Sequence, residues 1–377
     1  MDLYNKLSLL SVPSGYKINR SFNIKPFNNT EDFDFTRSTT ATRVNSKGII
    51  EVIAVDILRL DYAESLSSPS LLLERSSTNL ITYSEDFSQW SITSGTMSRE
   101  SGYLSPDGTN NAYKINGPTS SRIQLPTSGL TVGEQYTFSI YLKADAAMDI
   151  GIGGIVTATP DVSITTEWKR YEVTQIASST TRFPQVQYTG DLGNVYIWGA
   201  QLEQQTYATS YIPTDGASAT RNQELCVDAT PVINSEEGTL YAEISALAIY
   251  NLQRWLGLSD GTNNNKVIIA FYNNSTDYII ACEVKSGGST QAFMTYNFGA
   301  VEPTFVKVAI KYKENDFALW VNGTEVATDT SGSAPIGLSE LAFDRGDGAQ
   351  NFFGNTKGLK YYPKALADVQ LEDLTTI

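Results

Sequence analysis

The sequence predicts an all-β protein, with a short N-terminal β-hairpin segment followed by two antiparallel jelly-roll β-sandwiches. Short runs rich in Val, Ile, Thr, Tyr and Phe recur along the whole chain, and clusters of Gly, Pro, Asn, Asp and Ser separate them. With 377 residues the chain is longer than one domain usually is. We therefore expect two or three domains, each with its own core.

Residues 1–75 differ from the rest because their apolar positions are sparse and their runs are interrupted. Residues 39–44 and 49–55 flank a turn that contains Asn45 and Gly48, two residue types that accept the positive φ angles of a hairpin turn. The hairpin is expected to form, but the segment has too little apolar content to close a core alone. Its strands should find partners in other subunits, so residues 1–75 are predicted to be an oligomerisation segment.

Residues 76–222 are predicted to form the first jelly roll. Tyr136, Phe138, Ile140 and Leu142 recur at a spacing of two, which places their side chains on one face of a strand. Further strands are expected at 113–116, 150–154, 168–176, 183–188 and 195–202. This number of strands is typical of a sandwich.

Residues 223–377 are predicted to form the second jelly roll, with strands that include 255–259, 267–272, 278–284 and 306–312. Runs at 317–321 and 325–328 flank Asn322 and Gly323, the strongest hairpin signal in the chain. Pro363 is followed by good helix formers, so one short helix is expected at 363–369.

Composition excludes several classes of function. The chain has no histidine, so it cannot carry a Ser-His-Asp or Cys-His catalytic system, whereas glycoside hydrolysis by paired carboxylates stays open. The formal net charge of -14 disfavours nucleic-acid binding. We expect no signal peptide and no membrane span. Cys226 and Cys282 are expected to be reduced thiols, because they are far apart in sequence and show no metal or redox spacing.

Three sets of phrases carry a family likeness. They are FTRSTTATRVN at 35–45 with KGIIE at 47–51 and RLDY at 59–62; LLLE at 71–74, TNL at 78–80, YSEDFS at 83–88 and SPDGT at 105–109; and WGAQLE at 198–203, ATSYIPT at 208–214 and TR at 220–221. In this order they resemble a family of bacteriophage virion structural proteins, which includes head-fibre, tail-fibre and minor structural components. The resemblance covers about the first 220 residues. Residues 223–377 are similar in layout to concanavalin-like and laminin-G-like sandwiches.

The resemblance implies a non-catalytic head or tail fibre or decoration subunit of a virion, made in the host bacterial cytoplasm. It implies that residues 1–75 attach the protein to the capsid or tail, that the chain forms a homotrimer, and that 76–222 is a carbohydrate-binding-like, lectin-like jelly roll. The expected partners are other virion proteins and host-surface or mucosal glycans, with no nucleic acid and no membrane. Two alternatives stay open: a glycan depolymerase with paired carboxylates, and an architectural decoration without a ligand.

Aromatic rings that stack on sugars are the expected glycan contacts. Trp168, Trp198 and Trp320 lie in strand-like runs and are expected in the core, whereas Trp90 and Trp255 lie nearer loops or strand edges. Trp90 and Trp255 are therefore the candidate carbohydrate-binding residues, with loop anchoring as the alternative role for each. The acidic loop at 344–351 supplies oxygen atoms of the kind that calcium requires, but it does not match the twelve-residue EF-hand pattern, and acidic Gly-rich turns are common without a metal. No metal, no cofactor and no catalytic residue is predicted.

Overall fold

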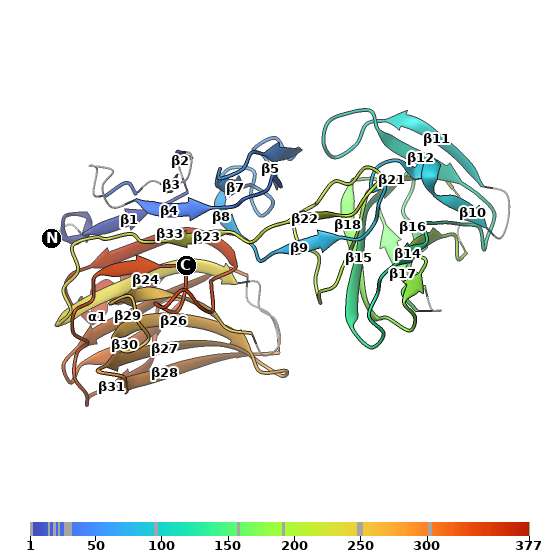
Figure 1. Ribbon diagram of the computed structural model, residues 1–377. Coiled ribbons are helices and arrows are strands. Elements are labelled where there is room, and N and C mark those ends of the chain that lie inside the picture. The colour runs from blue at the N-terminus through green and yellow to red at the C-terminus, as the bar shows by residue number, and fades with distance from the viewer. Residues whose placement is uncertain are drawn as a thin grey trace. The chain divides into compact units, whose positions relative to one another are not determined.

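The computed structural model describes residues 3–13, 16–17, 20–21, 23–25, 32–93, 97–156, 159–190, 193–246, 252–300 and 304–376. Within these ranges the chain forms antiparallel β-sheets, two short 3-10 helices (η1, Leu3–Lys6, and η2, Phe87–Gln89) and one α-helix, which confirms the all-β class. Two compact units result: unit 1 is Met1–Ser38, Val55–Arg75 and Gln223–Ile377, and unit 2 is Thr39–Ala54 and Ser76–Asn222. The chain therefore passes between the units four times (Figure 1).

Unit 2 contains two five-stranded antiparallel sheets of jelly-roll type (Figure 1). One sheet has the order β10 (Ser91–Thr93), β13 (Arg122–Gln124), β20 (Gln185–Gln187), β16 (Met148–Gly153) and β17 (Asp161–Ile164). The other has the order β11 (Ser98–Tyr103), β12 (Ala112–Asn116), β21 (Val195–Glu203), β15 (Gln135–Ala144) and β18 (Lys169–Ile176). Short pairs join β14 (Thr127–Ser128) to β19 (Thr181–Arg182), and β9 (Ser77–Asn79) to β22 (Ala219–Arg221).

The core of unit 2 follows from the alternation along β15. Tyr136, Phe138, Ile140 and Leu142 are all buried in one cluster, so the predicted inward face of this strand is confirmed. Both sheets contribute to the same cluster, which includes Ile150 and Ile152 of β16. Because alternate residues of a strand point to opposite faces, this spacing alone places a continuous apolar layer between the sheets.

The predicted hairpin in 39–55 forms from β5 (Ala41–Val44) and β6 (Ile50–Ile53) and belongs to unit 2. The Asn45 side chain accepts hydrogen bonds from the backbone N–H groups of Lys47 (2.9 Å) and Ile49 (3.2 Å), and Gly48 has a φ of 76°. The hairpin is fixed by the Ile50 N–H, which donates to the Pro106 carbonyl at 3.0 Å. Its strands therefore find their partners within the same chain.

Buried polar side chains close unit 2 where β9, β21 and the segment after β21 meet. The Glu203 carboxylate is fully buried and accepts hydrogen bonds from Ser77 Oγ (2.5 Å), Thr209 N (3.0 Å) and Gln205 Nε2 (3.2 Å). Asn79 donates to the carbonyls of two residues at 3.2 and 2.9 Å and is also completely buried. The phrases around 78–80, 198–203 and 208–214 thus hold these chain segments together, since buried polar groups need such partners.

Unit 1 contains an eight-stranded sheet and a five-stranded sheet (Figure 1). The larger has the order β31 (Thr324–Asp329), β30 (Phe317–Val321), β29 (Val306–Lys313), β24 (Glu237–Ala246), β33 (Gly354–Tyr362), β8 (Ser70–Leu73) and β7 (Arg59–Asp61), and β1 (Leu9–Ser11) also pairs with β33. The smaller has the order β28 (Ser289–Gly299), β27 (Tyr278–Ser286), β26 (Lys266–Asn273), β25 (Arg254–Ser259) and β32 (Glu340–Ala342). A small sheet joins β2 (Tyr16–Lys17), β3 (Arg20–Ser21), β4 (Phe33–Thr36) and β23 (Leu225–Val227).

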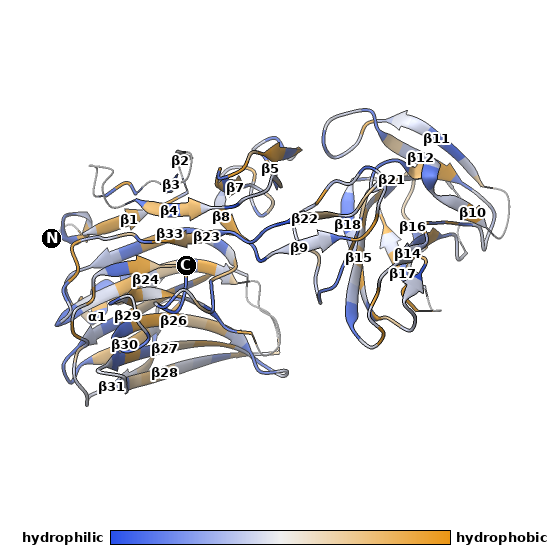
Figure 2. Cartoon of the chain, viewed as in Figure 1, coloured by the Kyte–Doolittle hydropathy of each residue, from blue (hydrophilic) through white to orange (hydrophobic). Residues whose placement is uncertain are grey.

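The apolar core of unit 1 draws on both large sheets and on the small sheet. Figure 2 shows hydrophobic residues along β4, β8 and β26. The predicted hairpin around Asn322 and Gly323 is confirmed by the pairing of β30 with β31. Cys226 and Cys282 are unpaired and buried in this core, and burial raises the pKa of both thiols.

The predicted short helix exists, but it begins later than expected. Helix α1 spans Asp368–Thr375, whereas the sequence predicts 363–369. Leu366 is buried and its N–H donates to Thr239 Oγ1 at 3.1 Å, so the segment after Pro363 is held against the sheet before the helix begins. Leu371 and Leu374 then pack in a cluster with residues of the eight-stranded sheet. No helix among the described residues has the length and apolarity to span a membrane.

Residues 1–75, predicted as a segment of their own, are divided between the two units. Strands β1 and β8 both pair with β33, which lies near the other end of the sequence, and β7 extends the same sheet. Strand β33 of the same chain thus provides pairing partners for β1 and β8, two strands of residues 1–75. Its role in attachment and assembly stays a prediction.

A buried ion network joins the three chain segments of unit 1. Glu224 Oε1 lies 2.6 Å from Arg37 NH1 and 2.8 Å from Arg59 Nε, and Arg59 NH1 lies 2.8 Å from Glu74 Oε2. The four side chains are between 0% and 4% exposed. Burial lowers the pKa of the Arg59 guanidinium, but the charges and hydrogen bonds of Glu224 and Glu74 together raise it above its ordinary value. The phrases at 35–45, 59–62 and 71–74 supply three of these four residues.

Candidate functional site

The predicted contact residue Trp90 lies in the core of unit 2. It is 2% exposed, its ring centroid lies 4.9 Å from that of Phe87, and its Nε1–H donates to the Tyr83 carbonyl at 2.9 Å. A ring that is covered in this way cannot stack on a sugar. The structure therefore favours the anchoring role for Trp90 over glycan contact.

Trp255 lies on β25 in unit 1 and is partly exposed. Its strand neighbours Leu256 and Leu258 belong to the main core, whereas Trp255 packs in a separate cluster on the other face of the sheet. The Lys266 ammonium lies 4.3 Å from the centre of the ring and 2.8 Å from a carboxylate oxygen of Glu283. One face of the indole thus already contacts a cation, which leaves only part of the ring for a ligand.

An open hollow of about 380 Å³ lies on unit 2 and is lined by Glu85, Asp86, Pro213, Thr214 and Asp215. Two chain segments that are far apart in the sequence meet there. Backbone pairing between Tyr83 and Asp215 holds them together. The volume falls in the range of about 300–1,000 Å³ that is usual for small-molecule sites.

Glu85 is the most buried carboxylate of this hollow. Tyr211 Oη donates to Glu85 Oε1 at 2.8 Å, and Asn111 Nδ2 donates to Oε2 at 2.7 Å. Burial raises the pKa of Glu85, and the charges of Asp107 and Asp215 raise it further, against the opposing Tyr211 hydrogen bond. Each carboxylate oxygen keeps a lone pair that can accept another hydrogen bond.

Asp86 and Asp215 differ in their surroundings. Asp86 caps helix η2: Oδ1 accepts from Ser88 N (2.9 Å) and from the Tyr113 hydroxyl (2.8 Å). Hydrogen bonds from Ser88 and then Tyr113 lower the pKa of Asp86. Asp215 is exposed at the rim. The hollow is therefore acidic, and its chemistry suits ligands that donate hydrogen bonds and carry no negative charge.

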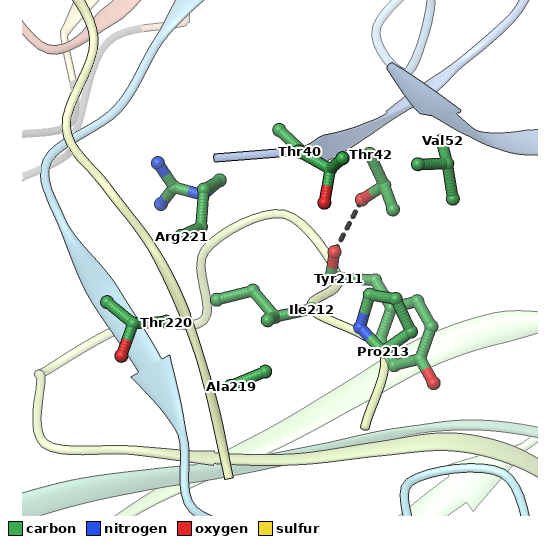
Figure 3. Close-up of a pocket in the computed structure, with 10 residues that line it drawn as sticks. Thr40, Thr42, Val52, Tyr211, Ile212, Pro213, Ala219, Thr220 and Arg221 are labelled. Carbon is green, nitrogen blue, oxygen red and sulfur yellow. Dashed lines mark hydrogen bonds between the residues drawn. The ribbon is translucent and has the colours of Figure 1, made fainter. Parts of the chain in front are cut away.

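A second, smaller cavity of about 60 Å³ lies beside the β5–β6 hairpin of unit 2 (Figure 3). Thr42 Oγ1 donates to the Tyr211 carbonyl at 2.5 Å across its wall. The other labelled lining residues are Thr40, Val52, Ile212, Pro213, Ala219, Thr220 and Arg221. This volume can hold a few water molecules but falls well short of a sugar ring.

Sequence reasoning did not single out the hollow as a site. Glu85 and Asp86 belong to the phrase at 83–88, and Pro213 and Thr214 to the phrase at 208–214. Both phrases belong to the resemblance described above, but local spacing cannot show that the two phrases meet in the fold. Among the described residues, no group of three or more His, Cys, Asp or Glu side chains is arranged to hold a metal ion.

No protein-family model matches the sequence, and no curated protein matches it. Among solved structures, the CBM40 module of the Ruminococcus gnavus IT-sialidase aligns over 38% of this chain and 84% of its own, with 19% identity and a TM-score of 0.32. Domains LG4-5 of the mouse laminin alpha1 chain align over 66% of this chain and 91% of their own, with 10% identity and a TM-score of 0.26. Because these scores are low, the sandwich fold is assigned here from the strand pairing of the chain itself.

Proposed function

We propose that the protein is a non-catalytic virion subunit of a bacteriophage, a head or tail fibre or decoration protein, that binds neutral glycans in the acidic hollow of unit 2. The observation that carries the glycan-binding part is the hollow of about 380 Å³ that Glu85, Asp86 and Asp215 help to line. The virion part is supported by the ordered phrases between residues 35 and 221, six of which also make buried contacts of the fold.

The charge of the hollow selects the class of glycan. Neutral sugars present several hydroxyl groups that donate hydrogen bonds, and carboxylates accept such bonds strongly. The net charge of the chain is -14, and none of the described residues that line the hollow is basic. An acidic sugar such as a sialoside would meet like charges at close range, and like-charge contact disfavours binding.

Catalysis by paired carboxylates is the second candidate, because the pKa of Glu85 is raised and that of Asp86 is lowered. Such a split is what a glycosidase uses for an acid and a nucleophile or base. The hydrogen bonds of Asp86 disfavour its use as a nucleophile or base. Its carboxylate already accepts from Ser88, Tyr113 and, at 3.2 Å, Gln89, so its lone pairs stabilise helix η2 and are not directed only at a ligand.

Glycan-array screening followed by calorimetry on the full chain tests this proposal. We expect saturable binding of at least one neutral glycan, and Asp215→Asn and Glu85→Gln should each weaken it about tenfold or more, since hydrogen bonds to charged groups contribute about 1.5–3 kcal/mol. Asp161→Asn is the matched control, because Asp161 is exposed on β17 and does not line the hollow. Equal affinity in all three variants would reject the hollow as the site.

Two further measurements separate the alternatives. If the protein releases reducing sugar from a bound glycan and Glu85→Gln abolishes this release, the depolymerase hypothesis would be established. Mass spectrometry and immunogold labelling of purified virions test the structural role, and absence of the protein from virions would contradict it. The expected homotrimer should be measured on the full chain, because deletion of residues 1–75 would remove strands from both units.

A further inference from the structure

Strand β28 (Ser289–Gly299) is an edge strand of the five-stranded sheet of unit 1, and the segment after β31 contacts it at Gln291, whose Oε1 accepts a hydrogen bond from Ser333 N at 3.0 Å. It has 11 residues and pairs with β27 as its one partner among the described strands. Its sequence, STQAFMTYNFG, contains no charged residue and no proline. Among the described strands of eight or more residues, β28 is the longest and is alone in lacking a charge.

The other edges of the two large sheets of unit 1 are protected. Strand β31 carries Glu325 and Asp329, β32 is three residues long and carries Glu340, and β7 is three residues long and carries Arg59. Short or charged edge strands are how proteins ordinarily prevent pairing with another chain. Strand β28 is neither short nor charged, and the contact with Ser333 described above involves Gln291, near the start of the strand.

Side chains of β28 also leave apolar surface in water. Phe293 is 59% exposed and Tyr296 is 37% exposed. Thr295 and Asn297 between and beyond them are exposed and uncharged. In a chain with a net charge of -14, an uncharged strand is a place where a second copy can approach with little local repulsion.

We propose that β28 is an interface that pairs, antiparallel, with β28 of a second copy of this chain. Two-fold pairing of this kind uses the same strand on both copies, joins the two five-stranded sheets into one, and leaves no β28 edge free for further addition. The proposal does not depend on glycan binding. If the chain also forms the expected trimer through another surface, β28 pairing links trimers in twos.

Mass photometry and sedimentation velocity of the full chain test the proposal, with Thr295→Lys as the perturbing variant. We expect dimers, or hexamers if trimers form. Thr295→Lys should halve the mass by weakening dimerisation about tenfold or more, because two-fold pairing brings two added positive charges into the same pair of strands. Thr328→Lys is the matched control, because Thr328 is an exposed threonine on the edge strand β31. A monomer or trimer without substitution, or a mass that Thr295→Lys leaves unchanged, would overturn the proposal.

Hydrogen exchange gives a second readout that does not depend on a variant. Amides of β28 that point away from β27 should exchange more slowly as protein concentration rises, while those of β31 should not change. Exchange in β28 that is independent of concentration would overturn the proposal. Open-ended aggregation in place of a defined species would do so too, because it shows an unprotected edge and not a two-fold interface.

Discussion

Glu224→Gln should destabilise unit 1 strongly, because it leaves two buried guanidinium groups with one carboxylate. In the native chain Arg37 and Arg59 share Glu224, and all three side chains are 0% exposed. The substitution keeps the size of the side chain but removes its charge, so Arg37 and Arg59 both lose a charged hydrogen-bond acceptor. Breaking a buried ion pair in this way costs about 3–5 kcal/mol. For a domain of about 200 residues, this lowers Tm by roughly 6–20 °C.

Differential scanning calorimetry of the full chain measures this shift, with urea denaturation as a check on the free energy of unfolding. Asp34→Asn is the control, because it breaks the exposed Arg20–Asp34 pair, whose side chains are 46% and 51% exposed. Surface pairs of this kind contribute little to stability. If Glu224→Gln changes Tm no more than Asp34→Asn does, the network does not stabilise the three segments of unit 1 and the reasoning fails.

Three other substitutions follow from local environments. Trp90→Ala should destabilise unit 2 by about 3–5 kcal/mol in thermal unfolding, because it removes a buried ring. Glycan affinity should stay unchanged at temperatures where the variant is folded. Lost affinity with intact stability would contradict the anchoring role of Trp90. Burial raises the pKa of Glu85 above 4.5, so this group stabilises unit 2 below that pH, and the stabilisation is lost as pH rises through the folded pKa. Glu85→Gln should therefore make Tm less dependent on pH in this window. An unchanged slope of Tm against pH would contradict the raised pKa. Gly257→Ala places a Cβ 2.2 Å from the Val267 carbonyl oxygen and should lower the free energy of unfolding in urea denaturation by at least about 1–3 kcal/mol. Gly358→Ala is the control, because no atom lies within 4 Å of the added Cβ. Equal stability of the two variants would refute the clash.

Elements specified by local sequence were predictable. The turn at Asn45 and Gly48 and the turn at Asn322 and Gly323 formed hairpins where the residue types allow positive φ. The two-residue period from Tyr136 to Leu142 identified the inner face of β15. These features depend on neighbours within a few residues, so the sequence contains the information that decides them.

Features that depend on distant partners were predicted less well. The start of α1 was placed too early, because docking of Leu366 on the eight-stranded sheet cannot be inferred from Pro363. The fate of residues 1–75 depends on pairing with β33, and no local pattern reports such a register. The same limit applies to the hollow. Glu85 and Asp215 come together only because Tyr83 pairs with Asp215 across the fold.

Pairing of β1 with β33 sets the order in which the two units can be completed during synthesis. Leu9 cannot pair until its partner in the sheet, Tyr361, has been synthesised. At roughly 5–20 residues per second, the ribosome needs tens of seconds to make the chain between them. Unit 2 needs nothing beyond Asn222 and is ready first. A ribosome stalled after unit 2 has emerged but before β33 is made would therefore display a finished unit 2 together with strands β1 and β8, which still lack their partner β33. Such a species is prone to chaperone capture and to wrong pairing between nascent chains.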